Sequence, residues 1–340
     1  MLYLDGSYGE GGGQIVRTSL SLAALVGEAV RIENIRAGRP KPGLKAQHLT
    51  AVKALARISG AEVKGAELNS LELTFIPGRV QAGHYVFDVA ETMGSAGSVS
   101  LVAQAILPAL LFAPGKSTVI IKGGTHVPWS PPVHYLLHVF LPLLARLGAQ
   151  VRLSLERWGF YPRGGGQVRL EVTPVTSLAP VELLTPATRG ELQALSAAGR
   201  LPEHVRRRQA ARLRERLGAG LPVAEAEADS LDPGSLVFLW GPGAGFSALG
   251  ARGKPAEQVA DEAVDAFLHY EARQAALDRH GADQLVLYLA QARGPSRFTT
   301  EAVTSHLLTN IWVIEQFLGP RFTVTGSLGE RGEVLCRGAS

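Results

Sequence analysis

The stretch Ala54–Val63, ALARISGAEV, reads as the end of an amphipathic helix that stops at Gly60 and passes directly into a strand. The stretch Leu143–Val151, LLARLGAQV, repeats the same pattern around Gly148. Each junction alone indicates only a helix end, because glycine adopts the left-handed conformation that ends a helix without steric cost. Two such junctions in one chain, with fainter echoes elsewhere, predict repeated α/β units.

Short apolar segments lie between the expected helices and read as strands. Their centres are Leu73, Ile120, Leu153 and Leu170. Helices and strands that alternate in this way are typical of mixed α/β layers, which is the fold class we expect. The chain has 340 residues, which is enough for a sizeable core and for two domains.

The pattern changes near residue 181, and we interpret residues 181–276 as an inserted small α/β domain. Two helices are expected there, Pro202–Leu217 and Pro255–Ala276, each with proline near its first turn. The first helix carries several arginines, which we interpret as a solvated face; a face that touches RNA is the alternative. Residues 1–180 and 277–340 then form the core of the protein.

The composition, with 46% hydrophobic and 19% charged residues, is that of a packed protein and excludes wholesale disorder. The longest apolar run, Leu101–Ala113, is too short for a membrane span, and we find no secretory signal, so we expect a cytoplasmic protein. The single cysteine, Cys336, excludes an internal disulfide and a cysteine-based metal site. Most of the 34 basic residues are arginines, which suit phosphate oxygens, although codon bias explains them equally well.

The segment Asp5–Gln14, DGSYGEGGGQ, is a glycine cluster between an expected strand, Leu2–Leu4, and an expected helix, Ile15–Leu25. A glycine loop at a helix N-terminus is suited to binding phosphate, although this one lacks the ending of a P-loop. Glu10 would hold a divalent cation beside a triphosphate, and Arg17 would reach a phosphate. The alternative is a sharp turn with a solvated Glu10.

A second candidate is the loop Arg36–Lys45, which holds four cations and two prolines before a helix that contains Gln47 and His48. A stiff cationic loop binds a polyanion at little cost in ordering. The alternative is an ordinary exposed loop. The tetrad Gly164–Gln167 repeats the GGGQ of the first cluster, but alternating apolar residues follow it, so we expect a turn that enters a strand.

A third candidate is the helix that opens at Ser305 and places Leu307 and Ile311 on its apolar face. His306 and Asn310 lie one turn apart on an adjacent face, near the helix N-terminus, where an anionic intermediate is favoured. The alternative is a half-buried histidine whose hydrogen bonds are satisfied.

In combination, these segments resemble the RNA 3′-terminal phosphate cyclase family, and the likeness runs from Leu4 through Leu318. The residues that carry it are, in chain order, Asp5-Gly6, Gly9–Ile15, Arg17, Ile35–Arg39, Lys41–Leu44, Gln47–Ala51, Gly94–Ser98, Gln104, Gly123–Thr125, Gly159–Pro162, Gly164–Gly166, Ala282–Gln284 and His306–Asn310.

The resemblance implies an ATP-dependent reaction on RNA that ends in a 3′-phosphate. A histidine attacks the α-phosphate of ATP, AMP moves to the RNA 3′-phosphate, and the neighbouring 2′-hydroxyl expels AMP to close a 2′,3′-cyclic phosphate. Neutral imidazole is an adequate nucleophile for this chemistry near pH 7. The resemblance also implies a divalent cation, Mg²⁺ or Mn²⁺, and leaves a homodimer open.

The resemblance assigns roles to residues of this chain. His306 becomes the nucleophile, Glu10 the metal ligand, and Arg36, Arg39 and Gln47 the residues that bind the RNA phosphate. The residues assigned to ATP are Arg17, Gln104, Pro131, His280, Asp283 and Gln284. In this set His280 stands where the family stacks an aromatic ring on adenine, with Pro131 or Pro132 facing it.

The resemblance further implies a core of three repeated βαβαββ-type units like the C-terminal domain of translation initiation factor three, with the small α/β domain inserted. Two other classes compete with this interpretation. One is a non-catalytic RNA-binding or ribosome-assembly factor of the cyclase-like type, and His306 argues against it. The other is an enolpyruvyl transferase, which also binds phosphate on arginines but does not need the segment around His306. Only the cyclase should retain acid-labile label from α-labelled ATP.

Overall fold

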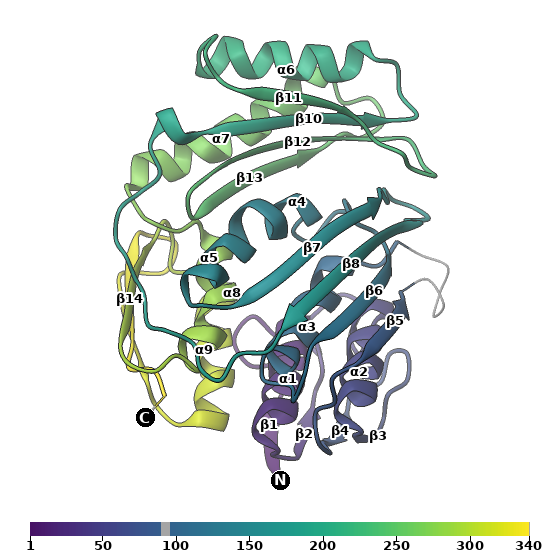
Figure 1. Cartoon of the computed structure of the whole chain (residues 1–340), viewed down its shortest axis with the longest axis vertical. Coiled ribbons are helices and arrows are strands. Elements are labelled where there is room, and N and C mark those ends of the chain that lie inside the picture. Colours follow the sequence, from purple (N-terminus) through teal and green to yellow (C-terminus); the bar gives the residue numbers. More distant parts are fainter. Residues whose placement is uncertain (90–95, 340) are drawn as a thin grey trace.

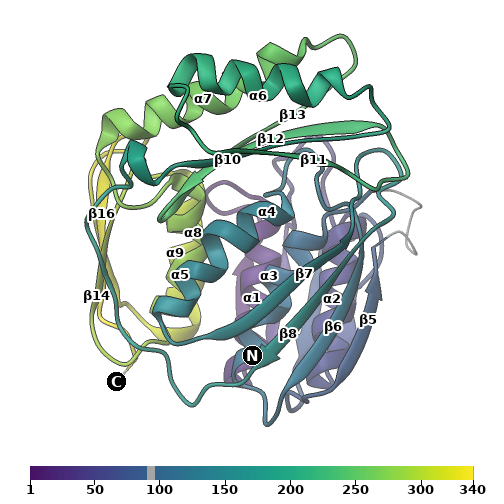
Figure 2. The same ribbon diagram turned by 45° about the horizontal axis from the view of Figure 1, so that its top comes forward.

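The computed structural model describes residues 1–89 and 96–339 and confirms a mixed α/β architecture. The described residues form four sheets of four strands each. Sheets lie at the outside of the lower part of the molecule, and helices α1 (Gly13–Val26), α3 (Val99–Leu111) and α9 (Ser305–Leu318) lie between them (Figure 1). The fourth sheet lies across the top (Figure 2).

The first sheet has the strand order β1-β2-β4-β3, in which β1 and β2 are parallel and β4 is antiparallel to both its neighbours. Its elements are β1 (Leu2–Asp5), α1 (Gly13–Val26), β2 (Val30–Glu33), α2 (Ala46–Ser59), β3 (Glu62–Lys64) and β4 (Leu73–Ile76).

The second sheet has the order β5-β6-β8-β7 with the same parallel and antiparallel pairs. Its elements are β5 (His84–Asp88), α3 (Val99–Leu111), β6 (Ser117–Gly123), α4 (Val133–Tyr135), the π-helical turn η2 (Leu136–Phe140), α5 (Leu141–Arg146), β7 (Gln150–Arg157) and β8 (Gly166–Thr173).

The third sheet has the order β9-β14-β16-β15, again with the same pairs. Its elements are β9 (Glu182–Leu183), α8 (Arg279–Leu289), β14 (Ser296–Thr300), α9 (Ser305–Leu318), β15 (Phe322–Thr325) and β16 (Gly332–Cys336). Each of the three sheets is thus built from strands and helices that follow one another in the same order.

The predicted helix ends at glycine are confirmed. Gly60 ends α2 with φ 61° and ψ 32°, and its amide donates to the carbonyl of Ala56. Gly148 follows α5 with φ 89°. The turn before β8 is also confirmed, since Gly164 and Gly165 both have positive φ and the strand starts at Gly166. The repeated sequence pattern therefore marks corresponding positions of the first and second sheets, namely the turn from α2 to β3 and the turn from α5 to β7.

The apolar run Leu101–Ala113 falls mostly within α3, whose residues are nearly all buried between neighbouring helices and strands. This burial explains why the run is hydrophobic all round. Among the described residues, no helix combines the length and the apolar character that crossing a bilayer requires.

The chain between β9 and α8 forms the fourth sheet, with the order β11-β10-β12-β13. Its elements are the short 3₁₀ turn η3 (Arg189–Glu191), β10 (Gln193–Gly199), α6 (His204–Leu217), β11 (Val223–Glu227), β12 (Gly234–Gly241), β13 (Ala244–Leu249) and α7 (Ala256–Arg273). Helices α6 and α7 lie on its outer side (Figure 2). A separate buried cluster that includes Val237, Phe246 and Phe267 holds these helices to the sheet. Because β9 pairs with β14, residues 182–183 belong to the third sheet, and the fourth sheet begins later than residue 181.

Three arginines of α6 form ion pairs with carboxylates of α7. Arg208 pairs with Glu257, while Arg212 and Arg216 both reach Asp261, at 2.8 and 2.7 Å. These contacts agree with a partly solvated helix face. They also occupy guanidinium groups that the alternative interpretation would assign to RNA.

His126, His134 and His138 form a column where the fourth sheet meets the segments that follow β6 of the second sheet. His126 Nε2 is 2.8 Å from His134 Nδ1, and His138 stacks on Trp240 of β12 with 4.4 Å between ring centres. Trp158 stacks on His126 at 4.2 Å. Burial lowers the pKa of His134 to about 4 and the pKa of His126 well below its usual value, so both rings are neutral at pH 7.

Candidate active site

The glycine loop after β1 lies between the N-terminal halves of helices α2 and α9. A side chain at Gly9, where φ is 57°, would meet the Thr309 hydroxyl of α9, because a Cβ there lies 2.3 Å from it. A Cβ at Gly13 would lie 2.1 Å from His48 Nε2 of α2. The ring of Tyr8 also stacks on Trp312 of α9 at 3.9 Å. Glycine is therefore required here because the loop touches both helices.

His306 lies in the first turn of α9, which is capped by Thr304, whose hydroxyl accepts from the Leu307 amide at 3.0 Å. Its Nδ1 is 3.1 Å from Asp283 Oδ2, and its Nε2 is 3.9 Å from Glu10 Oε2. The imidazole thus stands between carboxylates that come from α8 and from the glycine loop. One third of the side chain, 33%, remains exposed, so a substrate can reach it.

Burial lowers the pKa of His306, but the charges of Asp283 and Glu10 outweigh it, and the pKa ends above its ordinary value. Asp283 faces Nδ1, which favours the proton on that nitrogen. Nε2 then carries the lone pair in the neutral ring. The arrangement can therefore present Nε2 as a nucleophile.

Glu10 and Arg39 lie together, although the sequence assigned them to different ligands. The Arg39 guanidinium forms an ion pair with the Glu10 carboxylate, and it also donates to the Glu10 carbonyl at 3.1 Å. The Glu10 amide donates to the Thr309 hydroxyl at 3.1 Å. The basic loop, the glycine loop and α9 thus meet at one point.

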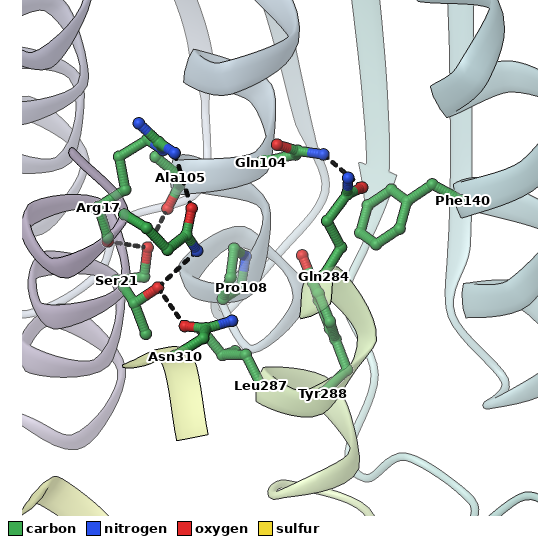
Figure 3. A pocket seen from close by; sticks show the side chains of 12 residues that line it. Arg17, Ser21, Gln104, Ala105, Pro108, Phe140, Gln284, Leu287, Tyr288 and Asn310 are labelled. Carbon is green, nitrogen blue, oxygen red and sulfur yellow. Dashed lines mark hydrogen bonds between the residues drawn. The ribbon is translucent and has the colours of Figure 1, made fainter. Parts of the chain in front are cut away.

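A chain of hydrogen bonds runs behind this point from α1 to α8. Arg17 is buried and donates to Gln14 Oε1 at 2.7 Å, and Gln14 donates to the Thr18 hydroxyl at 2.8 Å. Thr18 donates to Asn310 Oδ1 at 2.7 Å, and Asn310 donates to the Asp283 carbonyl at 2.6 Å. Figure 3 shows part of this chain. It fixes the helix that carries Asp283 relative to α1.

Burial lowers the pKa of Arg17 to about 10, against the opposing effect of the Asp283 and Glu10 charges. The guanidinium is therefore still charged at neutral pH. A buried arginine with spare donors can bind phosphate oxygens strongly, because little water competes with it.

A cavity of about 30 Å³ lies beside this chain, lined among others by Arg17, Gln104, Phe140 and Gln284 (Figure 3). Gln104 donates to the side-chain oxygen of Gln284 across it. The structure therefore brings together two residues that the sequence assigned to ATP. A cavity of this size holds one or two water molecules, so it is too small for a nucleotide as it stands.

Comparison with known proteins shows which family this chain belongs to. The sequence profile described as RNA 3′-terminal phosphate cyclase matches residues 8–324, which is most of the chain. The chain belongs to the RNA 3′-terminal phosphate cyclase family. Curated relatives named "RNA 3′-terminal phosphate cyclase" include those of Methylococcus capsulatus, 52% identical over 99% of this chain and 96% of the relative, and Gloeothece citriformis, 47% identical over 93% of each. That of Thermococcus onnurineus is 46% identical over 98% of each.

Among solved structures, the enolpyruvyl transferase NikO from Streptomyces tendae aligns with 97% of this chain and 64% of its own, at 13% identity and a TM-score of 0.27. A likeness at that level carries no argument about this member of the cyclase family.

In this member of the cyclase family, the adenine candidates His280 and Pro131 come from the first turn of α8 and from the loop before α4. His280 is exposed at the N-terminus of α8, edge-on to Tyr135 with 6.4 Å between ring centres. The Tyr135 hydroxyl donates to Asp278 Oδ1 at 2.8 Å. Pro131 is half-buried in the loop just before α4. Sequence analysis missed Tyr135 and Asp278, which hold this loop and α8 together.

The RNA candidates come from the basic loop and from the first turn of α2. Arg36 donates to the carbonyls of Lys41 and Gly43 at 2.8 and 2.9 Å, so it braces the basic loop from within. Gln47 is half-buried, and its Cβ packs near Gly97. Two residues of the neighbouring cyclase motif, Gly94 and Ser95, lie outside the described residues.

His48, next to Gln47, is buried under the glycine loop. Burial, and then the charges of Arg17 and Arg36, lower the pKa of His48 to about 3, so the ring is neutral. Its Nδ1 accepts from the Lys45 amide at 3.1 Å. The ring therefore supports the loop without adding charge to it.

Proposed function

We propose that this chain converts an RNA 3′-terminal phosphate into a 2′,3′-cyclic phosphodiester at the expense of ATP, through an AMP group held on His306. The observation that carries the proposal is the position of His306, partly exposed between Asp283 and Glu10 at the N-terminus of α9. Membership of the cyclase family and the names of its relatives support it.

In the first step, His306 Nε2 attacks the α-phosphorus of ATP. A P–N bond forms, the P–O bond to pyrophosphate breaks, and the imidazole gains positive charge. The Asp283 carboxylate, 3.1 Å from Nδ1, stabilises that charge electrostatically. Arg17 is placed to hold phosphate oxygens, and the positive end of α9 favours the negative charge that develops beside it.

In the second step, an oxygen of the RNA 3′-phosphate attacks the AMP phosphorus, and the P–N bond breaks to return neutral His306. The 2′-hydroxyl then attacks the 3′-phosphorus, loses its proton and expels AMP. Closing a five-membered ring from adjacent groups needs no further reactant.

We assign the RNA 3′-phosphate to the basic loop, with Arg39 as the principal contact and Arg36 and Gln47 beside it. A planar guanidinium matches a phosphate with two parallel hydrogen bonds. Arg39 holds Glu10 in the structure, so binding the phosphate would exchange one anion for another.

We assign a divalent cation, Mg²⁺ or Mn²⁺, to Glu10. Among the described residues no group of three or more histidine, cysteine, aspartate or glutamate side chains is arranged to hold a metal ion. A single carboxylate fits a cation that is bound mostly by triphosphate oxygens and water, as Mg²⁺ usually is beside nucleotides. When bound, the ion would neutralise charge on the departing pyrophosphate.

We assign the adenine to the space between His280 and Pro131, with Gln104 and Gln284 as polar contacts. The Tyr135–Asp278 hydrogen bond and the contact between the Tyr135 and His280 rings join the segments that carry these two residues. The Gln104–Gln284 hydrogen bond would open to admit a nucleotide. Imidazole stacks more weakly than a phenol ring, so we expect modest affinity for adenine.

We also propose that the three equivalent sheets are repeats of the type in the C-terminal domain of translation initiation factor three. Their shared strand order supports this. The fourth sheet with α6 and α7 would be a domain inserted into the third repeat, since the chain leaves that repeat after β9 and re-enters it at α8. An RNA substrate also favours a cytoplasmic location.

The direct test is incubation with α-labelled ATP. We expect label to stay on the protein through denaturation and to be lost in acid, because a phosphoramidate is acid-labile. His306→Ala should take up no label and cyclise no RNA, at least 100-fold below the parent, with an unchanged circular dichroism spectrum. Label on the folded His306→Ala protein would overturn the assignment. A parent protein that takes no label would favour a non-catalytic RNA-binding factor.

A further inference from the structure

Trp129 is a large aromatic side chain that no part of the described chain covers. Its side chain is 98% exposed, and its backbone is left-handed, with φ 65°. Both features are unfavourable for the isolated protein, since an indole ring gains stability from burial and a bulky residue rarely adopts positive φ. Such a residue points to a role in binding.

The loop that carries Trp129 is well held. The Gly124 amide donates to the Gly97 carbonyl at 2.8 Å, and the Val133 amide donates to the Thr125 carbonyl at 3.0 Å. Within the loop, the Ser130 hydroxyl donates to the Val127 carbonyl at 3.2 Å. The backbone therefore presents the exposed indole from a fixed position.

A second exposed aromatic residue lies on the adjoining loop. Tyr161 is 67% exposed, and its loop pairs with the first one through a bridge between His126 and Phe160. The Thr125 and His126 amides both donate to the Gly159 carbonyl, at 2.9 and 3.0 Å. Two exposed rings thus come from two loops that are joined at their backbones.

The loop that carries Trp129 also joins segments that hold RNA candidates and adenine candidates. At the start of this loop, the Gly124 amide donates to the Gly97 carbonyl, and Gly97 lies beside the RNA candidate Gln47. At the end of this loop, the Tyr135 hydroxyl of α4 donates to Asp278, close to the adenine candidate His280. An RNA strand whose 3′-phosphate lies near His306 has to leave the site across a neighbouring surface. The loop that carries Trp129 belongs to such a surface, because both of its ends contact segments of the candidate site.

The charge nearby favours a nucleic acid over a protein as the occupant. Gln47 lies in the first turn of α2, directly after the basic loop with Arg39, Lys41 and Lys45. Cationic side chains beside exposed aromatic rings form the usual combination for single-stranded RNA, in which charge attracts the backbone and the rings stack on bases.

We infer that Trp129 and Tyr161 stack on the bases of the nucleotides that precede the 3′-terminal nucleotide of the RNA. This inference rests on the proposed function, because that function places the 3′-phosphate at the site. Stacking accepts every base, so the contact adds affinity without sequence preference. It would make the enzyme favour RNA chains over mononucleotides.

The test compares binding of two fluorescent RNAs with a 3′-phosphate by anisotropy. One is an ordinary short oligonucleotide, and the other has the same length and charge but lacks the bases before its terminal nucleotide. We expect Trp129→Ala to bind the ordinary RNA about 5- to 150-fold more weakly, since stacking on one base is worth ~1–3 kcal/mol. The RNA without bases should bind both proteins equally.

Trp129→Phe should recover most of the affinity, because it restores an aromatic face, and Tyr161→Ala should repeat the loss. Tyr3→Ala is the matched control, since Tyr3 is 68% exposed and lies on β1 outside the proposed contacts. Equal affinity of Trp129→Ala and the parent for ordinary RNA would overturn the inference. So would a change in self-association on sedimentation with RNA affinity unaltered, which would assign the surface to a second copy.

The same proteins are incubated with α-labelled ATP, which needs no RNA. A parent protein that takes no label would refute the proposed function, while the binding comparison would still judge the stacking contact. A parent that takes label and cyclises RNA, combined with a Trp129→Ala protein of full RNA affinity, would refute the stacking contact alone.

Discussion

At His306, two carboxylates oppose the effect of burial on protonation. Lowering the pH through this raised pKa protonates Nε2 and removes the lone pair of the proposed nucleophile. Self-adenylylation should therefore fall on the acid side with an apparent pKa above that of an ordinary histidine.

Asp283→Asn tests this cause. Without the Asp283 charge the pKa of His306 should fall, because a nearby opposite charge typically shifts a pKa by about 1–3. The acid limb of the rate of label uptake should move to lower pH by about one pH unit or more, and the plateau rate should drop since imidazolium loses its stabilising partner. Rates of label uptake between pH 5 and 9 at fixed ionic strength measure both effects. An acid limb that stays in place would show that Asp283 does not set the protonation of His306.

Arg39 offers a second residue-scale prediction. Arg39→Lys keeps the charge opposite Glu10 but loses the planar fork that suits a phosphate. Transfer of AMP to RNA should slow about tenfold or more, because hydrogen bonds to charged groups are worth ~1.5–3 kcal/mol, while self-adenylylation is comparatively spared. Single-turnover rates of the two half-reactions separate them. A variant defective only in self-adenylylation would place the basic loop on ATP.

Residues of the site differ in how far the sequence reveals them. The glycine cluster, the basic loop and the His306–Asn310 pair all carry local signals, namely turn-forming residues, charge density and helical spacing. The Glu10–Arg39 ion pair and the Thr18–Asn310 hydrogen bond carry none, because they join residues that only the folded chain brings together. The same holds for Tyr135 and Asp278.

At the scale of elements, the ion pairs between α6 and α7 suggest a measurable electrostatic contribution. Asp261 serves two arginines, Arg212 and Arg216, and its side chain is 26% exposed. Asp261→Asn should lower the unfolding temperature by a few degrees at low salt, and the difference should shrink at about 1 M salt, which screens partly exposed charges.

Differential scanning calorimetry at two salt concentrations measures this difference. Glu227→Gln is the control, since Glu227 is an exposed carboxylate on β11 of the fourth sheet, against which α7 packs. A loss for Asp261→Asn that is the same at both salt concentrations would point to packing instead of charge.

Elements were predicted best where a single residue type decides the backbone. Helix ends at Gly60 and Gly148 are fixed by the left-handed conformation, which glycine alone adopts freely. The π-helical turn Leu136–Phe140 and the two-residue strand β9 were not foreseen. Both depend on neighbours in the fold, since a short apolar run suits an α-helix as well as a π-helix and a strand of two residues has no periodicity.

At the scale of the whole molecule, the histidine column links the fourth sheet to the second unit. The unfolded chain binds protons on histidine below about pH 6.5, while folded His134 resists protonation until about pH 4. The unfolded state therefore binds more protons between these values, so stability should fall as the pH drops from 6.5 towards 4. The effect should be on the order of 1–3 kcal/mol for a histidine shifted this far.

His134→Gln removes the titrating ring, so its free energy of unfolding should depend less on pH than that of the parent. His204→Gln, at an exposed position on α6, is the control and should keep the parent's slope. Urea unfolding at several pH values between 4.5 and 7 provides the comparison. Equal slopes for all three proteins would exclude the column as the cause.

The junction of α1 with α9 also has a consequence for the timing of synthesis. Glu10 and Arg39 are made long before Asp283 and His306, which lie more than 200 residues further along the chain. The hydrogen bonds from Thr18 to Asn310 can form only once α9 has emerged. A nascent chain therefore lacks the proposed nucleophile, His306, until α9 has been made, so the proposed self-adenylylation should begin only after that point.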